Sequence, residues 1–271
     1  MSATPHSPHD ESPGADAAGS LHGRRAVVTG GGSGIGEAAC RALAAAGAAV
    51  VVLDRDEEGA RRVAEEIGGQ ALVADLLDTD ALAKLDLGGE QGEAVDILVS
   101  NAGIQKVAPI PDFPLEDFRR IQTIMVEAPF VLVKSVLPGM YARGFGRIVH
   151  VSSVHGLRAS EFKSGYVTAK HAIEGMSKVT ALEGAEHGVT SNCVNPGYVR
   201  TPLVEKQIAD QAKAHGISAQ EVVEQVFLQD TAIKRMVEPE EVGALVAFLC
   251  GPQAGMITGS SYLMDGGWTA H

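Results

Sequence analysis

Short apolar runs rich in valine, isoleucine and leucine alternate along this chain with longer stretches of helical pattern. Seven runs predict strands, at residues 26–29, 49–54, 71–74, 96–100, 147–152, 190–195 and 261–265. They are almost continuously apolar, as strands are when helices cover both faces of a parallel sheet. Gly47, Gly68 and Gly188 follow three of the helical stretches, where helix C-caps belong. The alternation predicts one α/β domain with a doubly wound, seven-stranded parallel sheet flanked by helices.

The first 20 residues differ from the rest, because they contain mainly Pro, Ser, Asp, His and Ala and no apolar run. This composition cannot repay the entropy of ordering, so we expect a disordered tail at 1–20 and a single domain over 21–271. The tail lacks the apolar core of a secretory signal. His6 and His9 make too weak a cluster for a metal site, and we expect no metal.

The composition limits the partners that the protein can have. Of 271 residues, 45% are hydrophobic, which allows a large core, and the net charge is −12. A surface this acidic repels nucleic acid and anionic membranes, so we expect neither as a partner. The three cysteines, Cys40, Cys193 and Cys250, lie far apart in the chain and match no metal-binding spacing. They indicate buried thiols in a reducing compartment, and we expect a cytoplasmic protein.

A glycine-rich run, TGGGSGIG from Thr29 to Gly36, directly follows the first predicted strand and opens the first helix. Glycines at 30, 34 and 36 permit a tight turn, close approach of the backbone and close packing of the helix on the strand. The free N–H groups at the helix N-terminus would then face a pyrophosphate. A lone glycine-rich run could be a flexible loop, but this context predicts a Rossmann-type dinucleotide site.

Acidic residues end the next two predicted strands. Asp54 ends the second strand, where its carboxylate can accept hydrogen bonds from an adenosine ribose and would repel a 2′-phosphate. The neighbouring Arg55 could neutralise such a phosphate, but the carboxylate favours NAD over NADP. Asp75 follows the third strand, where it could contact the adenine or simply cap the loop. The sequence therefore predicts NAD as the cofactor.

Tyr166 and Lys170 belong to the run YVTAK, and their spacing of four places both on one face of a helix. A tyrosine is a poor base at neutral pH, and an adjacent ammonium favours its phenolate and brings its pKa into a working range. Ser153, after the fifth strand, can orient a substrate carbonyl or alcohol. Each residue alone has an ordinary structural explanation. Together, beside a dinucleotide site, they predict a catalytic centre.

These motifs, with NAG at 101–103 and NPGYVRTP at 195–202, resemble the classical short-chain dehydrogenase/reductase family over residues 21–271. The resemblance implies a nicotinamide cofactor, Tyr166 as catalytic acid/base, Lys170 as the residue that lowers its pKa and binds the nicotinamide ribose, and Ser153 as substrate orienter. It also implies that residues from Pro196 to Thr201 line the nicotinamide side. The expected cofactor-binding residues are Gly30, Ser33, Gly34, Ile35, Gly36, Asp54, Asp75, Leu76, Asn101, Ala102, Gly103, Tyr166, Lys170, Pro196, Gly197, Val199 and Thr201.

The chain departs from this family at one position. The family usually has an asparagine in the helix after the fourth strand, where it holds a water in the proton relay, and an ungapped match places Met125 there. A thioether cannot replace the donors and acceptor of an amide. Either a water and a backbone carbonyl suffice, or proton release through Lys170 is impaired, so Met125 is not included among the catalytic residues.

The loops give the expected substrate. The stretches at 101–110, 152–171 and 195–208 are similar to those of the D-3-hydroxybutyrate dehydrogenases, a group within the family. This similarity implies NAD-linked interconversion of (R)-3-hydroxybutyrate and acetoacetate. It also implies a set of groups that bind the substrate carboxylate, which together with Ser153 and Tyr166 are Gln105, His155, Lys163 and Gln207. Lys106 stands where those enzymes often have histidine, which would alter only the rim of the site.

Three alternatives remain open. The protein could act on another small hydroxy acid or a secondary alcohol, it could reduce 3-oxoacyl-carrier-protein substrates, which Asp54 disfavours, or it could bind NAD without catalysis. The family resemblance further implies a lid at about 197–230 and a homotetramer. We expect the apolar C-terminal segment, including Trp268, near a subunit contact, although the same residues could simply complete the core of one chain.

Overall fold

The computed structural model of the protein describes residues 20–87, 94–202, 204, 205, 208, 212 and 217–270. Within them, seven strands form one parallel sheet in the order β3-β2-β1-β4-β5-β6-β7. The strands are β1 (Arg25–Thr29), β2 (Ala49–Asp54), β3 (Gln70–Val73), β4 (Ile97–Ser100), β5 (Gly146–Val151), β6 (Val189–Pro196) and β7 (Ser261–Met264). Each predicted strand is confirmed to within one residue at either end. The fold is the expected doubly wound, Rossmann-type sheet.

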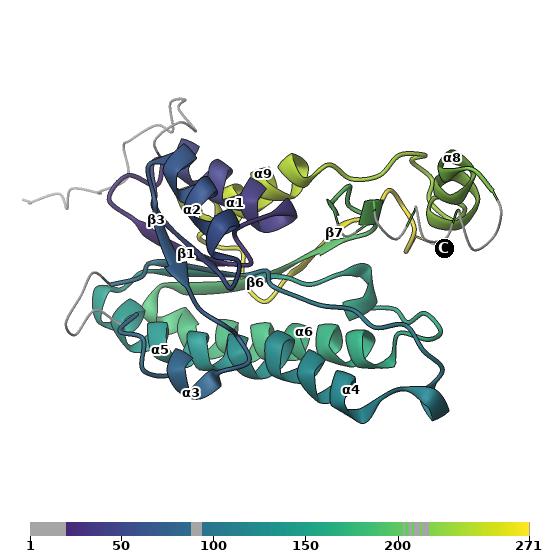
Figure 1. The fold of residues 1–271 in the computed structure, drawn as a ribbon. Coiled ribbons are helices and arrows are strands. Elements are labelled where there is room, and N and C mark those ends of the chain that lie inside the picture. Colours follow the sequence, from purple (N-terminus) through teal and green to yellow (C-terminus); the bar gives the residue numbers. More distant parts are fainter. Residues whose placement is uncertain are drawn as a thin grey trace, which may run out of the picture.

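Helices cover both faces of this sheet (Figure 1). On one face lie α1 (Gly34–Ala45), α2 (Glu57–Ile67) and α9 (Pro239–Cys250), and on the other α3 (Thr79–Leu82), α4 (Leu115–Gln122), α5 (Ala128–Arg143) and α6 (Ser164–Gly184). Gly68 and Gly188 end helical segments with φ of 65° and 70°, and Gly47 lies one residue beyond the cap of α1 with φ of 95°. The C-cap glycines expected from the sequence are confirmed.

Alternate residues of each buried strand face opposite helix layers, which explains why the apolar runs are continuous. In β1, Ala26 and Val28 pack in the cluster with α1 and α9, whereas Val27 packs in the cluster with α5. In β2, Val52 and Leu53 divide between the layers in the same way. The hydrophobic core is therefore two layers separated by the sheet.

One continuous helical segment, Leu115–Arg143, is long and apolar enough to cross a membrane by length and composition alone. It consists of α4, a π-helical turn η2 (Thr123–Glu127) and α5. Ile121, Leu132 and Met140 on it are fully buried against the sheet, as expected for a core helix of an α/β domain.

A third, smaller apolar cluster lies at the end of the molecule that holds α8 (Ala219–Val222) and the π-helical turn η5 (Val223–Phe227), to the right in Figure 1. Its buried members are Ile208, Val222, Phe227, Leu228 and Met236. Ile208, Val222, Phe227 and Leu228 fall within 197–230, the segment expected to form a lid, of which residues 203, 206, 207, 209–211 and 213–216 lie outside the described residues. The three cysteines are free and buried, as the sequence predicts.

Candidate active site

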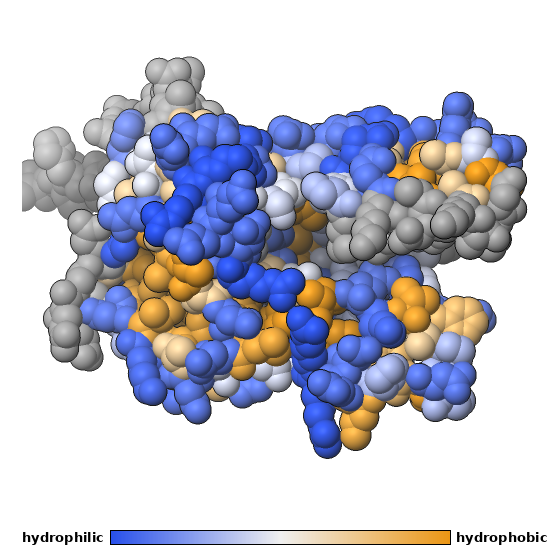
Figure 2. Space-filling model, viewed as in Figure 1, coloured by the Kyte–Doolittle hydropathy of each residue, from blue (hydrophilic) through white to orange (hydrophobic). Residues whose placement is uncertain are grey.

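A cavity of about 600 Å³ opens at the carboxyl ends of the strands. Figure 2 shows the surface hollowed between the layer of α1 and α2 and the layer of α4. The strand order reverses around β1, whose two neighbours are β2 and β4, and in doubly wound sheets such a point forms the ligand crevice. The structure thus places the cavity where a dinucleotide is expected.

Most of the predicted cofactor residues line this cavity. They are Gly30, Ser33, Gly34, Ile35, Asp54, Asp75, Leu76, Asn101, Ala102, Gly103, Tyr166, Lys170, Pro196, Gly197, Val199 and Thr201. Gly36 is the exception, because it lies behind the loop. A Cβ there would lie 2.0 Å from the carbonyl oxygen of Gly30, so the missing side chain allows α1 to pack against the loop rather than to touch a ligand.

The glycine-rich loop fits a dinucleotide. Gly30 and Gly34 adopt φ of 65° and 55°, a conformation that favours glycine, and a Cβ on Gly34 would fill space against Thr201. Ser33 caps α1 through its backbone and makes no side-chain cap hydrogen bond, so the first N–H groups of the helix face the cavity without a side-chain acceptor from Ser33. Asn101 holds the loop from β4, since its Nδ2 donates to the carbonyls of Thr29 and Gly30 at 3.0 and 3.2 Å.

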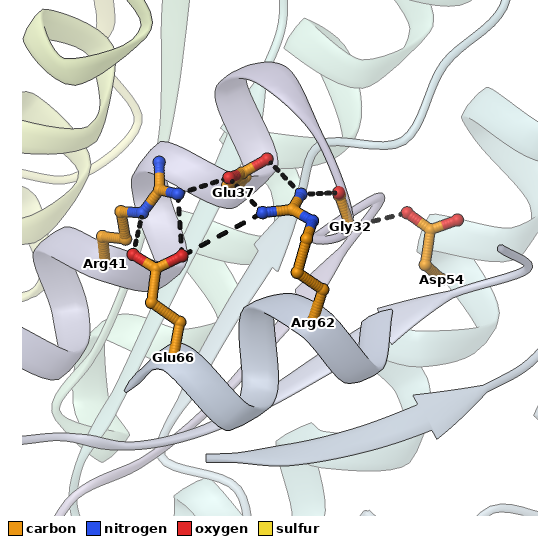
Figure 3. A network of polar contacts seen from close by, with 6 residues as sticks. All are labelled: Gly32, Glu37, Arg41, Asp54, Arg62 and Glu66. Atoms are coloured by element: carbon orange, nitrogen blue, oxygen red, sulfur yellow. Dashed lines mark hydrogen bonds and ion pairs between the residues drawn. The ribbon is translucent and has the colours of Figure 1, made fainter. Parts of the chain in front are cut away.

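The carboxylate of Asp54 is held by two backbone donors. The N–H of Gly32 donates to Oδ2 and the N–H of Asp56 to Oδ1, each at 3.0 Å. Figure 3 shows that this contact continues through Gly32 into a network of charged side chains from α1 and α2. Arg55 also lines the cavity. Two opposite charges therefore lie at the end of the cavity where the sequence predicts the adenosine, and only the carboxylate is fixed by hydrogen bonds among the described residues.

Helix α6 brings Tyr166 and Lys170 to the cavity on the same face, as the spacing predicts. The ammonium of Lys170 lies 5.4 Å from the ring centroid of Tyr166 and donates to the carbonyl oxygen of Val151 at 2.6 Å. Ser153 follows β5 and caps a short 3₁₀ turn, its Oγ accepting from the N–H of His155 at 3.2 Å. The three predicted catalytic residues thus meet from α6 and the β5 loop.

Burial shifts the pKa values of this group. It lowers the pKa of Lys170 to about 8, and it raises the pKa of Tyr166, an effect that a hydrogen bond with Ser153 opposes. The group that opposes this rise is the hydroxyl of Ser153, and the lowering of the Tyr166 pKa by Lys170 stays a prediction. With a pKa of about 8, Lys170 still carries its proton, and hence its positive charge, near neutral pH.

Three of the four predicted carboxylate-binding residues, Gln105, His155 and Lys163, line the same cavity. Lys163 is half-buried at the N-cap of α6, and burial lowers its pKa. Within the described part of the chain it makes no ion pair, and its ammonium lies 5.9 Å from the ring centroid of Tyr198. Gln207 lies outside the described residues. Among the described residues, three cations without an ion pair line this cavity, and Lys163 is the one that belongs neither to the Tyr166–Lys170 pair nor to the Asp54 end, where Arg55 lies.

His155 is held as a neutral donor or acceptor. Burial, with the charge of Lys163 adding to it, lowers the pKa of His155 to about 4. Its Nε2 lies 2.8 Å from Oγ of Ser160, which also lines the cavity. Lys106 pairs instead with Asp117 at 3.6 Å and does not line the cavity, consistent with its expected place at the rim.

Met125 lies in the π-helical turn η2 and is buried, with its thioether close to Gly103, three residues beyond β4. The turn is therefore formed without an asparagine. Met125 does not line the cavity, although the neighbouring Ile124 does.

Two aromatic residues line the cavity wall, Trp268, which the sequence placed only near a subunit contact, and Tyr198, which lies within the expected 196–201 run but was not singled out. Trp268 stacks on His155 with ring centroids 6.0 Å apart, so the segment after β7 forms part of the cavity wall. Tyr198 stacks on Phe227 at 4.3 Å and so joins the wall to the apolar cluster around α8. An aromatic residue in each motif, PGYVRTP and DGGW, was the only available signal.

Comparison of the sequence with known proteins shows the family to which the chain belongs. Residues 30–269 match the family model described as enoyl-(acyl carrier protein) reductase. A D-beta-hydroxybutyrate dehydrogenase of Rhizobium meliloti is 43% identical over 256 residues, covering 91% of this chain and 99% of the relative. One of Cupriavidus necator is 41% identical over 261 residues, covering 92% and 99%. A cyclohexanol dehydrogenase of Acinetobacter is 36% identical, covering 90% and 94%. The chain belongs to the short-chain dehydrogenase/reductase family.

Solved structures agree with this assignment. A Beutenbergia cavernae protein, assigned as an NAD(P)-dependent gluconate 5-dehydrogenase and solved with NADP at low occupancy, has a TM-score of 0.82 and 34% identity, covering 94% of this chain and 100% of that one. The protein is thus an oxidoreductase with a nicotinamide cofactor.

Proposed function

We propose that the protein is an NAD-dependent dehydrogenase that interconverts (R)-3-hydroxybutyrate and acetoacetate. The observation that carries this proposal is the position of Lys163, a half-buried cation in the same cavity as Tyr166 and Ser153. A four-carbon acid has little apolar surface, so its binding depends mainly on its carboxylate. In a chain of net charge −12, only a local cation can supply that attraction. The two relatives named as hydroxybutyrate dehydrogenases support the same substrate.

In this proposal, different residues of the chain bind the substrate, orient it and transfer its proton. Lys163, with hydrogen bonds from Gln105 and His155, binds the carboxylate end of the substrate, and Ser153 orients the hydroxyl end. Tyr166, as the phenolate that the ammonium of Lys170 stabilises, takes the hydroxyl proton and becomes a neutral phenol. A nicotinamide cofactor bound by the residues of the glycine-rich loop and by Lys170 would supply the hydride acceptor. Trp268 and Tyr198 exclude water around the reacting groups.

The choice of NAD depends on Asp54. Its carboxylate is fixed by two N–H donors at the adenosine end, where it can accept from a ribose diol and repel a 2′-phosphate. The fit of the loop to a dinucleotide does not by itself distinguish the cofactors, and a similar solved structure contains NADP. We further propose that the enzyme acts in the cytoplasm as a homotetramer.

The test is one assay of the purified protein with NAD or NADP and a panel of alcohols, monitored by the absorbance of the reduced cofactor. We expect (R)-3-hydroxybutyrate with NAD to give the highest kcat/KM, well above that of (S)-3-hydroxybutyrate, 2-butanol and cyclohexanol. A higher kcat/KM for 2-butanol or cyclohexanol would replace the proposal with a neutral-alcohol dehydrogenase, an activity that the Acinetobacter relative makes relevant. If no member of the panel were turned over, the proposed substrate would be wrong.

A further inference from the structure

The loop residue Gly32 lies between Asp54 and helix α2. Its N–H donates to Oδ2 of Asp54 at 3.0 Å. A Cβ on Gly32 would lie 3.0 Å from that same oxygen and 3.1 Å from the backbone N of Ala60. Only a residue without a side chain reaches the carboxylate this closely, so the position of Asp54 depends on the position of the Gly32 backbone.

The other polar group of Gly32 is bound from α2. The carbonyl oxygen of Gly32 accepts a hydrogen bond of 3.0 Å from Nη2 of Arg62 (Figure 3). The two peptide planes that flank Gly32 are thus each fixed by a different partner, Asp54 on one side and Arg62 on the other.

Arg62 is itself held by a carboxylate from α1. Glu37 accepts from Nη1 and Nη2 of Arg62 at 2.9 and 2.8 Å, a two-point geometry that fixes the plane of the guanidinium. Hydrogen bonds from Arg62 and the charge of Arg41 lower the pKa of Glu37, so it stays ionised at neutral pH. Glu37 also pairs with Arg41, which binds Glu66 on α2 at 2.7 Å. The network joins α1, α2 and the glycine-rich loop.

We propose that Arg62 is a positioning residue for cofactor choice, which holds Gly32 against Asp54 and so favours NAD over NADP. This inference rests on the proposed NAD preference. An oriented Asp54 carboxylate accepts from a ribose diol without further ordering, and it cannot turn away from a 2′-phosphate. Loss of Arg62 would free Gly32 and leave the carboxylate of Asp54 held only by the N–H of Asp56, which weakens NAD binding and reduces the repulsion of NADP.

Arg61 is the matched control. It precedes Arg62 on α2 and carries the same charge, but it pairs with Glu57 on its own helix at 2.7 Å. Its side chain is 69% exposed, and such pairs contribute little to stability. Removing either arginine changes the net charge equally, so a difference between the two variants reports the contacts that Arg62 makes with Gly32 and Glu37.

The experiment measures the dissociation constants of NAD and NADP by calorimetry for the wild type, Arg62→Ala, Arg61→Ala and Asp54→Ser. Arg62→Ala should weaken NAD binding about fivefold to tenfold, the scale of one ordinary hydrogen bond, because Arg62 acts on the cofactor only through Gly32, while NADP binding changes less. Its KM for NAD should rise with kcat at saturating NAD nearly unchanged, because the reacting groups are untouched. Arg61→Ala should stay within about twofold of the wild type, and Asp54→Ser should lose the preference.

The outcomes separate the two proposals. A wild type that binds NADP more tightly than NAD would overturn the proposed cofactor. A wild type that prefers NAD, with an Arg62→Ala variant that loses affinity equally for both cofactors or for neither, would overturn the positioning role alone. Thermal unfolding checks that both arginine variants are folded. Arg62→Lys should retain part of the preference, because an ammonium cannot pair at two points with Glu37 and also bind Gly32.

Discussion

Lys170 is held by Val151, because its ammonium donates 2.6 Å to the carbonyl oxygen of that last residue of β5. One proton of the ammonium is therefore committed to the sheet, and the others remain free for the Tyr166 side of the cavity and for a cofactor ribose. The contact ties the position of the cation to the strand that also leads to Ser153. A small movement of α6 relative to β5 would therefore change the position of the Lys170 ammonium relative to Ser153.

We expect Tyr166→Phe to lower kcat by about 100-fold or more, since the variant loses its general base. NAD affinity should change little, because the ring and its packing remain. Steady-state rates and calorimetric binding check this. Tyr141→Phe is the control, because Tyr141 stacks on His187 and does not line the cavity. A Tyr166→Phe variant that turns over near the wild-type rate would contradict the catalytic role.

Binding of the substrate through its carboxylate should depend on Lys163. Lys163→Ala should raise the KM for (R)-3-hydroxybutyrate about 30-fold or more, the lower end of the roughly 2–5 kcal/mol for removing one partner of a buried pair, since Lys163 is only half-buried. Activity on 2-butanol should remain low and unchanged. Lys106→Ala removes a cation of the rim and should have little effect. Equal KM effects of the two variants would show that Lys163 provides only long-range attraction.

Substitutions of Met125 test whether a proton relay through this turn limits the reaction. Met125→Asn restores an amide in the π-helical turn, and turnover at low pH should rise if the relay limits proton release there. Met125→Leu keeps an apolar side chain of similar size and should leave the pH profile unchanged. Rates of the asparagine variant that match the wild type at every pH would remove the relay from the mechanism.

His150 should make the protein sensitive to acid. Burial lowers its pKa to about 4 from an ordinary value of 6.5, so between these values the unfolded chain binds more protons than the folded one. Stability therefore falls as pH drops through this window, by about 2 kcal/mol between pH 7 and pH 5 for one such group. Urea unfolding at both pH values checks this. A His150→Gln variant should lose less stability over the same range, and equal losses would exclude His150 as a source.

The C-terminal segment should form a subunit contact. Three large apolar side chains there are exposed to solvent, Phe248 by 47%, Met256 by 96% and Leu263 by 45%. Exposed apolar side chains that gather in a patch are typical of protein–protein contact surfaces. Light scattering at micromolar concentration should give the mass of four chains, and Leu263→Glu should reduce it. Val107→Glu, in the loop after β4, should not. A monomeric wild type would contradict the assembly.

The strands and the cofactor loop were predictable because their determinants are local. Continuous apolar runs define buried parallel strands, and TGGGSGIG directly follows one of them. The carboxyl ends of parallel strands meet at one edge, which brought Asp54, Ser153 and Tyr166 together as expected.

Contacts between distant segments were not predictable. The stack of Trp268 on His155 joins residues far apart in the chain, and nothing local to either residue indicates it. Arg62 belongs to an ordinary charged helix face, and its contact with Gly32 depends on how α2 packs on the loop. The pKa of Tyr166 also depends on burial, which a spacing of four residues cannot report.

The burial of every cysteine has a practical consequence. Burial raises the pKa of Cys40 and of Cys250 to about 12 and raises that of Cys193 further, so almost no thiolate exists at neutral pH. The native chain should therefore react slowly with maleimides and tolerate air without a reductant. A cysteine introduced at an exposed position such as Arg61 would carry a single fluorophore, without first removing the natural thiols.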